Sequence, residues 1–280
     1  MSQFWLTPAL ARTLLDAMRQ GSRQIECSPD LGLSRVQVEL SADGVAAPDG
    51  AWAPAARLAE VAAARRGCFV YEGGRLEPVE RSNGHFYKLI PTGEAPTIEI
   101  SGIQMHRTTG TAPFQNAMNS ARRVVRKGAK VLDTCGGLGY TAIAAARLGA
   151  ASVVSVEVNP NVRAIARLNP WSAEYFTHPA IVLVEGDAAE FVATQPDASF
   201  DQVIHDPPRF SRAGELYGAE FYGQLARILR PGGRLFHYTG EPYSRGNARA
   251  FVAGVMRRLG DAGFEVERAD DLQGVVAGRK

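Results

Sequence analysis

Four carboxylate residues follow four segments that have the pattern of buried β-strands. They are Asp133, Glu157, Asp187 and Asp206. In open α/β sheets, ligands bind outside the carboxyl ends of the strands, so we expect these side chains to meet at one edge of a sheet. There, Glu157 is placed to accept both hydroxyls of a ribose, and Asp187 to accept an adenine amino group. An N-cap role for the following helix is the alternative for either of these two.

A glycine-rich loop follows the first of these strands. Its sequence is Asp133-Thr134-Cys135-Gly136-Gly137-Leu138-Gly139. Such a loop lets backbone N–H groups approach a ligand closely at the start of a helix. The run from Gly137 to Ala142 also fits the G-x-G-x-x-A pattern of NAD sites, and a tight turn without a ligand also needs glycines. The loop alone therefore leaves the ligand open.

The elements that must position these residues alternate along the second part of the chain. Strands are predicted at 130–135, 152–158, 181–185, 201–205, 234–238, 264–268 and 275–277, and helices at 140–148, 162–168, 188–194, 214–229 and 248–259. Alternating strands and helices predict an α/β fold with a mostly parallel sheet covered on both faces. Because a short turn joins the last two strands, one of them is expected to be antiparallel.

The first part of the chain has a different texture. Residues 1–105 mix short predicted strands with helices at 8–18 and 58–66, and Asp43-Gly44 marks a turn in a small strand pair. This predicts a small α+β domain at 1–105 and a ligand-binding domain at 106–280. His106 and Arg107 lie at the junction, where such a segment can act as a lid.

Composition narrows the class of protein. The chain has 280 residues, of which 45% are hydrophobic and 21% charged, and its net charge is +2. This is typical of a globular protein and lacks the strong basic bias of a dedicated nucleic-acid binder. Three scattered cysteines without a C-x-x-C pair argue against a disulfide framework or a zinc site, so no metal is expected and a reducing cytoplasm is the predicted location. No apolar stretch reaches the ~18 residues of a membrane span.

The motifs, taken together, resemble a known family. Asp133 to Gly139 resembles the first motif, D-x-G-x-G-x-G, of class I S-adenosylmethionine (SAM)-dependent methyltransferases, with Cys135 in place of the first glycine. Glu157, Asp187 and Asp206-Pro207-Pro208 match the next motifs in order and spacing. The chain is most similar to predicted archaeal-type methyltransferases, through stretches at 100–107, 168–172, 204–211, 214–217 and 235–240. It also resembles bacterial enzymes that cyclise SAM to azetidine-2-carboxylate.

The resemblance implies a fold and a cofactor. The fold is a Rossmann-like class I methyltransferase domain with a seven-stranded mixed sheet, preceded by the small α+β domain. The cofactor is SAM. Its expected contacts are Asp133, Cys135, Gly137, Gly139, Tyr140, Glu157, Asp187, Ala188 and Asp206.

Three residues are expected to act in catalysis. Asp206-Pro207-Pro208 resembles the Asp/Asn-Pro-Pro-aromatic loop of amino-directed methyltransferases, in which a side-chain oxygen and a proline carbonyl orient the target nitrogen. Here Arg209 takes the fourth position and Phe210 follows it. Arg209 is expected to clamp a substrate carboxylate or phosphate, or to pair with Glu215. Tyr140 is expected to hold the sulfonium by a cation–π contact.

The leading functional hypothesis is methyl transfer from SAM to a small molecule or a base, with nitrogen as the expected target. Cyclisation of SAM with release of methylthioadenosine is one alternative. RNA methylation is another, supported by a basic run at 122–130, for which a solvated helix end is the commoner explanation. Aminopropyl transfer lacks the acidic cluster it would use, and a SAM-binding regulator would not need Asp206-Pro207-Pro208.

Overall fold

The computed structural model describes residues 3–208, 213–240 and 247–280, and for residues 247–249 the backbone alone. The chain divides into two compact units. The first comprises Met1–Pro113 and Ala164–Ala173, and the second comprises Phe114–Arg163 and Glu174–Lys280. The domain boundary expected between residues 105 and 106 remains a prediction.

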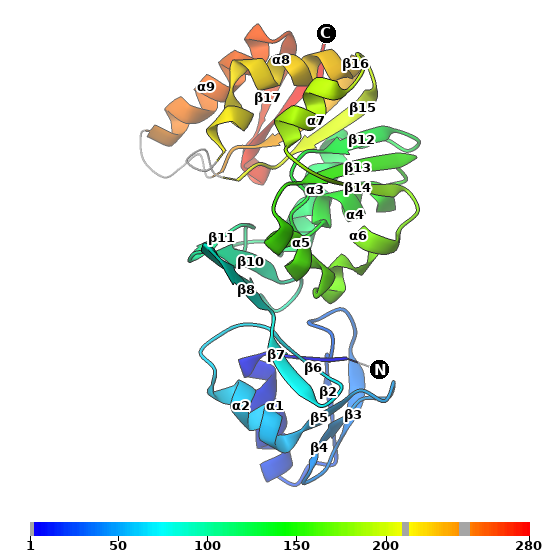
Figure 1. Ribbon diagram of the computed structural model, residues 1–280, viewed down its shortest axis with the longest axis vertical. Helices are drawn as coiled ribbons and strands as arrows, with labels where there is room; N and C mark the ends of the chain where they lie inside the picture. Colours follow the sequence, from blue (N-terminus) through cyan, green and yellow to red (C-terminus); the bar gives the residue numbers. More distant parts are fainter. Residues whose placement is uncertain (1–2, 209–212, 241–246) are drawn as a thin grey trace. The chain divides into compact units, whose positions relative to one another are not determined.

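The second unit is built on a mixed sheet, which has seven strands within the described residues, in the order β14-β13-β12-β15-β16-β18-β17 (Figure 1). The strands are β12 (Lys130–Asp133), β13 (Ser152–Glu157), β14 (Ile181–Glu185), β15 (Phe200–His205), β16 (Leu229–Tyr238), β17 (Phe264–Ala269) and β18 (Gly274–Arg279). Strands β12 to β16 run parallel, and β18 is antiparallel to both of its neighbours. The predicted seven-stranded mixed α/β sheet with an antiparallel end is confirmed.

Helices cover both faces of this sheet. They are α3 (Pro113–Val124), α4 (Tyr140–Arg147), α5 (Pro160–Arg167), α6 (Ala173–Thr177), α7 (Ala188–Thr194), α8 (Ala219–Ile228) and α9 (Asn247–Asp261). Helix α8 contacts both α7 and α9, while α4 contacts β12, β13 and β14 (Figure 1). Short 3-10 turns are η1 (Pro170–Ser172), η2 (Gly214–Tyr217) and η3 (Asp270–Leu272).

One predicted helix, at 214–229, was wrong as a single element. The structure divides it into η2 and α8, because Gly218 has an extended backbone with φ −79° and ψ 154° and stands as the N-cap of α8. The chain also leaves the helix one residue earlier than predicted, since Leu229 already begins β16. The break matters for the site, because η2 packs beside the Asp206-Pro207-Pro208 loop.

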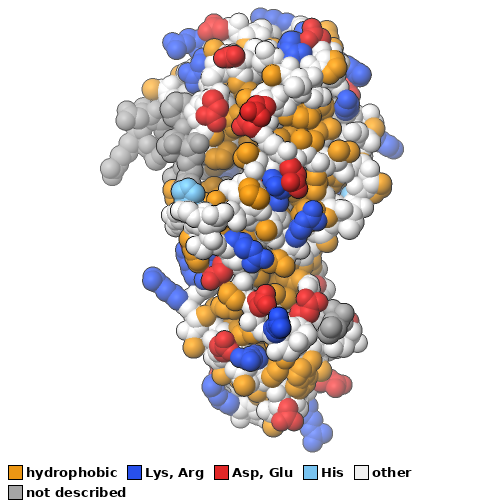
Figure 2. All heavy atoms as spheres, in the orientation of Figure 1, with side chains coloured by type: hydrophobic (Ala, Val, Ile, Leu, Met, Phe, Trp, Pro, Cys, Tyr) orange, Lys and Arg blue, Asp and Glu red, His pale blue; other side chains and the backbone are white. Residues whose placement is uncertain are grey.

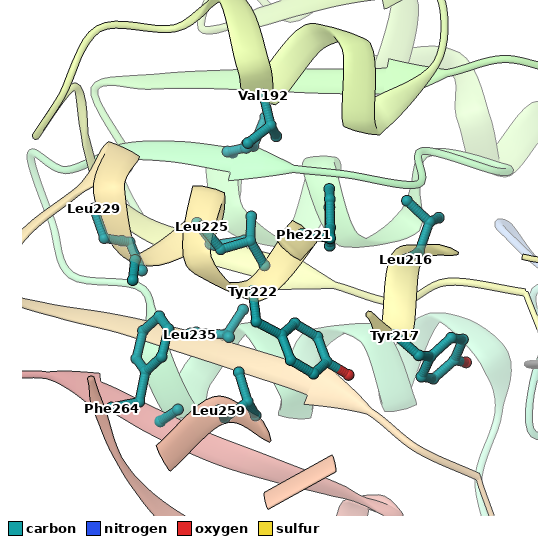
Figure 3. Close-up of a cluster of buried hydrophobic side chains, with 14 of the residues drawn as sticks. Val192, Leu216, Tyr217, Phe221, Tyr222, Leu225, Leu229, Leu235, Leu259 and Phe264 are labelled. Carbon is teal, nitrogen blue, oxygen red and sulfur yellow. The ribbon is translucent and has the colours of Figure 1, made fainter. Parts of the chain in front are cut away.

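The core of the second unit lies between the sheet and α7, α8 and α9 (Figure 3). Phe221, Tyr222 and Leu225 of α8 are buried against Leu235 of β16. Full burial of one such apolar side chain stabilises a fold by roughly 1.5–3 kcal/mol. This face is thus the stable platform from which the strand ends project.

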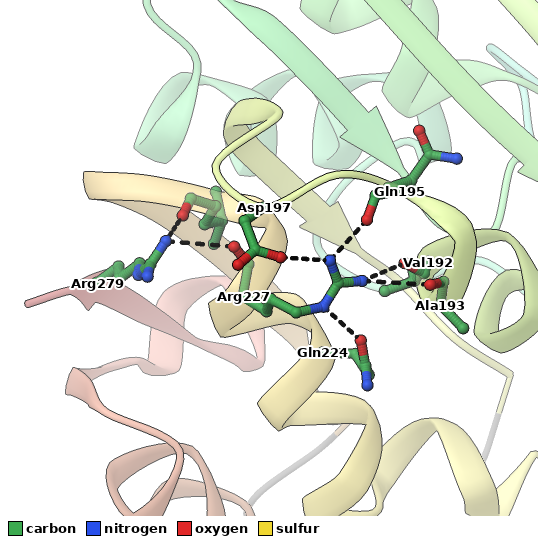
Figure 4. A network of polar contacts seen from close by, with 8 residues as sticks. Val192, Ala193, Gln195, Asp197, Gln224, Arg227 and Arg279 are labelled. Carbon is green, nitrogen blue, oxygen red and sulfur yellow. Dashed lines mark hydrogen bonds and ion pairs between the residues drawn. The ribbon is translucent and has the colours of Figure 1, made fainter.

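Arg227, which is partly buried, connects α8 to α7 (Figure 4). Arg227, in the last turn of α8, donates to the carbonyl oxygens of Val192 and Gln195 at 3.0 and 2.6 Å and pairs with Asp197 at 2.8 Å. These carbonyls lie at the C-terminal end of α7, where orphan acceptors need donors. Arg279 of β18 adds a hydrogen bond to the Leu229 carbonyl. The network locks the two helices to the end of the sheet.

The first unit contains three small antiparallel sheets, with orders β2-β3-β4-β5, β1-β6-β7 and β11-β10-β9-β8. Its strands are β1 (Phe4–Leu6), β2 (Gln24–Cys27), β3 (Val36–Leu40), β4 (Gly44–Ala46), β5 (Trp52–Pro54), β6 (Phe69–Glu72), β7 (Arg75–Pro78), β8 (Glu80–Asn83), β9 (His85–Ile90), β10 (Thr97–Ile100) and β11 (Ile103–Gln104).

Two helices, α1 (Pro8–Arg19) and α2 (Ala55–Ala63), pack against each other in this unit. Thr7 caps α1 by accepting a hydrogen bond from the Leu10 amide. The predicted strand pair around Asp43-Gly44 is confirmed as β3 and β4. None of the helices in the described ranges combines the length and apolar character needed to cross a membrane.

Candidate functional site

The glycine loop between β12 and α4 depends on backbone conformations that suit glycine. Gly137 and Gly139 have φ of 55° and 81°, in the left-handed region. Space is a second constraint, since a Cβ on Gly139 would lie 2.2 Å from Cγ of Tyr175. The loop is therefore seated directly on the Tyr175 ring.

Glu157 connects the end of β13 to this loop. One carboxylate oxygen accepts a hydrogen bond from the Gly137 amide at 2.8 Å, and the other accepts from the Asn159 amide at 2.7 Å. Burial raises the pKa of Glu157, while these two hydrogen bonds and the charge of Arg163 lower it. The helix-capping alternative belongs to a neighbour, because the Asn159 side chain accepts from the Asn161 amide at the start of α5.

Asp187 is the N-cap of α7. Its Oδ1 accepts hydrogen bonds from the amides of Ala189 and Glu190 at 2.7 and 3.0 Å. The capping alternative is thus observed, and it uses one of the two carboxylate oxygens, so the adenine contact remains a prediction for the other. Ala188 is buried in the core cluster, which leaves its backbone as the part that can reach a ligand.

Asp133 is fully buried at the end of β12. Its Oδ2 accepts a hydrogen bond from the Ser155 hydroxyl at 2.7 Å, and its Oδ1 has no hydrogen-bond partner among the described residues. Burial raises the pKa of Asp133 to about 6, while the hydroxyls of Ser155 and Thr141 and the Cys135 backbone amide act on the carboxylate in the opposite direction. A buried carboxylate oxygen without a donor is costly, and it marks a place where a ligand donor fits.

Asp206 follows β15, the strand paired with β12, so it lies next to Asp133 at the same sheet edge. Burial, and then the charge of Asp133, raise the pKa of Asp206 to about 7. The second proline of the loop is held in place, because the Tyr217 hydroxyl donates to the Pro208 carbonyl at 2.9 Å. Arg209, expected to be catalytic, and Phe210 lie outside the described residues.

The buried His205, directly before Asp206, is held in place by two hydrogen bonds. His205 Nε2 lies 2.9 Å from the Leu216 carbonyl, and its Nδ1 lies 2.7 Å from the Thr134 hydroxyl. A carbonyl only accepts, so Nε2 carries the proton and Nδ1 accepts from Thr134. Burial lowers the pKa of His205 to about 4, so the ring is neutral near pH 7.

Tyr140, the aromatic residue expected to hold the sulfonium, is buried in a packing contact. It is the first residue of α4, is 2% exposed and meets Phe114 edge-on with ring centroids 5.7 Å apart. Tyr175 packs against the glycine loop. Cys135 packs against the core cluster, and burial raises the pKa of its thiol, so it acts as a small neutral residue.

The basic run at 122–130 is divided among structural contacts. Arg123 pairs with Asp271, Arg122 donates to Asn119, and Lys130 lies over the Phe200 ring at 4.8 Å. On the face shown in Figure 2, Lys and Arg side chains are interspersed with Asp and Glu. The helix-end explanation fits Arg122 and Arg123, which stand in the last turn of α3. In the first unit, His106 Nδ1 lies 2.9 Å from the Thr97 hydroxyl, a structural contact.

The sequence analysis missed one residue that contacts Asp133. This residue is Ser155, although a hydroxyl within Val153-Val154-Ser155-Val156 is a signal that a buried polar partner exists. Val158, directly after Glu157, is apolar and 61% exposed, a property that only the structure gives. Among the residues with described positions, no cluster of three or more His, Cys, Asp or Glu is placed to hold a metal ion.

Comparison with known proteins identifies the domain and its relatives. Residues 132–237 match the family described as "Methyltransferase domain". The uncharacterised protein MJ1233 of Methanocaldococcus jannaschii is 48% identical over 75% of this chain and 72% of its own length. A polyamine aminopropyltransferase of Streptomyces coelicolor is 32% identical over 47% of this chain, and a putrescine N-methyltransferase of Nicotiana tabacum 28% identical over 49%. The chain spans 25% and 36% of the lengths of these last two proteins.

The fold is also found in solved structures. A spermidine synthase bound to the transition-state analogue AdoDATO matches with a TM-score of 0.59 at 18% identity, covering 72% of this chain and 73% of that one. The spermidine synthase of Thermotoga maritima matches with a TM-score of 0.54, covering 71% of each chain. With the glycine loop, the strand-end carboxylates and the 48% identical relative, the conclusion is that this chain belongs to the class I SAM-dependent methyltransferases, in one family with MJ1233.

Proposed function

We propose that this enzyme transfers a methyl group from SAM to a nitrogen atom of a small molecule. The observation that carries the proposal is Asp206, followed by Pro207 and Pro208, at the same sheet edge as the buried Asp133. Nitrogen is favoured because a carboxylate oxygen and a proline carbonyl are both acceptors, and an amine presents two N–H donors to them. The relatives named for putrescine and polyamine chemistry support an amine substrate.

The residues fit SAM. The unpartnered Oδ1 of Asp133 offers an acceptor for the ammonium of the methionine part, and Glu157 lies where ribose hydroxyls are expected. Val158 offers an apolar surface to the adenine ring, and Asp187 retains one oxygen for its amino group. When bound, SAM supplies a methyl group already activated by the positive sulfonium.

The chain's own residues then have to orient and deprotonate the amine. Asp206 accepts an N–H hydrogen bond, which points the nitrogen lone pair away from the carboxylate. The nitrogen must reach the methyl group in line, so this positioning is the main catalytic contribution. Because its pKa is raised to about 7, Asp206 is also suited to take up the proton that the methylated amine releases.

The experiment that tests this function compares donors and acceptors. Purified protein is incubated with SAM alone, with SAM plus putrescine or other small amines, and with SAM plus RNA, and products are identified by mass spectrometry. Amine-dependent formation of S-adenosylhomocysteine and a methylated amine is the expected result. Methylthioadenosine from SAM alone would instead establish cyclisation, and methylated RNA would move the substrate to nucleic acid.

Aminopropyl transfer is the second candidate, because a polyamine aminopropyltransferase is among the relatives. Decarboxylated SAM with putrescine separates the two. Aminopropyl transfer would release methylthioadenosine and spermidine, whereas methyl transfer to putrescine would release the adenosyl thioether and N-methylputrescine.

A binding measurement tests the cofactor itself. We expect SAM and S-adenosylhomocysteine to bind and NAD not to, since Asp133 offers an acceptor suited to an ammonium group, which NAD lacks. Calorimetry with the three ligands decides this, and NAD binding more tightly than SAM would contradict the assignment.

A further inference from the structure

A chain of hydroxyl groups leads through the interior of the second unit to Asp133. The Tyr175 hydroxyl lies 2.9 Å from the Ser155 hydroxyl, which lies 2.7 Å from Oδ2 of Asp133. All three side chains are buried, with 2%, 0% and 0% exposure. Ser155 stands directly opposite Asp133 in the register of β12 and β13, which explains why the two side chains meet.

The direction of this chain follows from the number of protons. An ionised carboxylate only accepts, so the single Ser155 hydroxyl proton is donated to Asp133. The Ser155 oxygen then accepts from the Tyr175 hydroxyl. Successive hydrogen bonds that run in one direction strengthen each other, and this series ends at Oδ2 of Asp133.

The other oxygen of Asp133 is left for a ligand. Oδ1 has no partner within the described parts of the chain, although the residue is fully buried. The groups that act on Asp133 electrostatically include the carboxylates of Glu157 and Asp206, so the surroundings are negative. A cationic N–H donor is the group that such a place accepts best.

The Tyr175 side chain also packs directly against the glycine loop. A Cβ on Gly136 would lie 2.1 Å from the Tyr175 hydroxyl oxygen, and one on Gly139 would lie 2.2 Å from its ring. The Tyr175 side chain therefore packs against the loop mainly through its ring and reaches Asp133 only through the Ser155 hydroxyl. Tyr175→Phe removes this link and keeps the ring.

We propose that Tyr175 and Ser155 are positioning residues, which fix Asp133 so that its free oxygen receives the ammonium of the cofactor's amino-acid part. The inference rests on the SAM site of the proposed function, but not on the identity of the methyl acceptor. It makes the Tyr175–Ser155 pair a determinant of specificity for adenosyl sulfur compounds whose side chain carries an ammonium group.

The test compares two ligands that differ in that part. S-adenosylhomocysteine carries the ammonium, whereas 5′-methylthioadenosine has the same adenosine and sulfur without it. Dissociation constants are measured by calorimetry for the wild type, Tyr175→Phe and Ser155→Ala. We expect S-adenosylhomocysteine to bind about tenfold more weakly to Ser155→Ala, and severalfold more weakly to Tyr175→Phe, with methylthioadenosine affinity unchanged.

Controls make the result decisive. Tyr222→Phe removes another buried tyrosine hydroxyl of the same unit, one that faces His237, and should leave both affinities unchanged. Asp133→Asn should show the same ligand selectivity as Ser155→Ala, with a larger effect. If Ser155→Ala fails to fold, Ser155→Thr takes its place in the test. It retains the hydroxyl and should bind S-adenosylhomocysteine like the wild type.

Two outcomes would overturn the inference. Equal weakening of both ligands would show that Tyr175 and Ser155 merely support the loop, and unchanged affinities for both would show that Asp133 does not need them. Failure of the proposed function is seen separately, as absence of methylated amine in the turnover assay while the two ligands still bind with the expected selectivity.

Discussion

At the scale of single residues, Glu157 is expected to have two roles, which are ribose binding and support of the glycine loop. Its carboxylate is expected to hold the ribose, and it already accepts the Gly137 and Asn159 amides. Glu157→Ala should weaken SAM binding by about tenfold or more, because charge-assisted hydrogen bonds contribute roughly 1.5–3 kcal/mol. Glu157→Gln keeps one acceptor oxygen and should lose less. Calorimetry checks both, and an unchanged dissociation constant in the Ala variant would restrict Glu157 to supporting the loop.

Asp206 should affect turnover more than binding. Asp206→Ala is expected to reduce kcat far more than it raises the dissociation constant of SAM, since the contact to the nucleophile is made mainly in the transition state. Asp206→Asn should retain part of the activity, because an amide oxygen still accepts a hydrogen bond. Steady-state kinetics with an identified amine provide the measurement. Equal inactivity of both variants would show that accepting the proton, and not orienting the nitrogen, is the main contribution of Asp206.

At the scale of elements, the glycine loop and α6 form one packed layer. Gly139→Ala introduces a Cβ 2.2 Å from the Tyr175 ring at a φ of 81°, so both space and conformation oppose it. We expect this variant to lose SAM binding and several degrees of thermal stability. Gly186→Ala, where a Cβ meets nothing within 4 Å, is the matched control and should melt like the wild type. Thermal melts with and without SAM compare them, and wild-type behaviour of Gly139→Ala would contradict the packing described.

The sequence predicted the helices and strands more accurately than the contacts between their side chains. The alternation of apolar strands and helices was sufficient for β12 to β18 because parallel strands are buried on both faces and read as apolar runs. The same alternation did not predict the break at Gly218, because a glycine within a helical pattern can take either a helical or an extended backbone conformation. The Tyr175–Ser155 contact joins residues from separate elements, so no local pattern contains it.

The four carboxylates could be predicted because each one stands at the end of a predicted apolar strand or within two residues after it. Their individual partners could not, since Glu157 and Asp187 fit both a ligand and a capping role by sequence. Only the placement of Asn159 at the start of α5 and of Asp187 on α7 separates these roles.

At the scale of the whole second unit, buried groups act on stability in opposite directions. His205 has a pKa of about 4 when folded against 6.5 normally, so the unfolded chain binds more protons between these values and stability is lost as the pH falls through them. Asp206 has a pKa raised from 3.8 to about 7, so its contribution is present below 3.8 and lost as the pH rises toward 7.

Removing the Asp206 charge should therefore stabilise the protein where that charge is present. Asp206→Asn is expected to raise the melting temperature at pH 8, by roughly 2–4 °C for each kcal/mol of electrostatic relief, with a smaller gain at pH 6. Calorimetric melts at the two pH values check this. A gain that is equal at both, or absent, would show that Asp206 does not titrate in this range.

The position of β18 between β16 and β17 bears on how the chain acquires its fold during synthesis. The strands β12 to β15, which end at or just before the carboxylates, leave the ribosome before β16 to β18 and pair with one another. Strand β17 joins the sheet through β18, which is translated after it. Until residues 274–279 emerge, β16 presents an open edge, and such an edge can recruit other strands. The nascent chain thus has an assembled cofactor edge and an unfinished opposite flank, and its last strand completes the sheet by insertion.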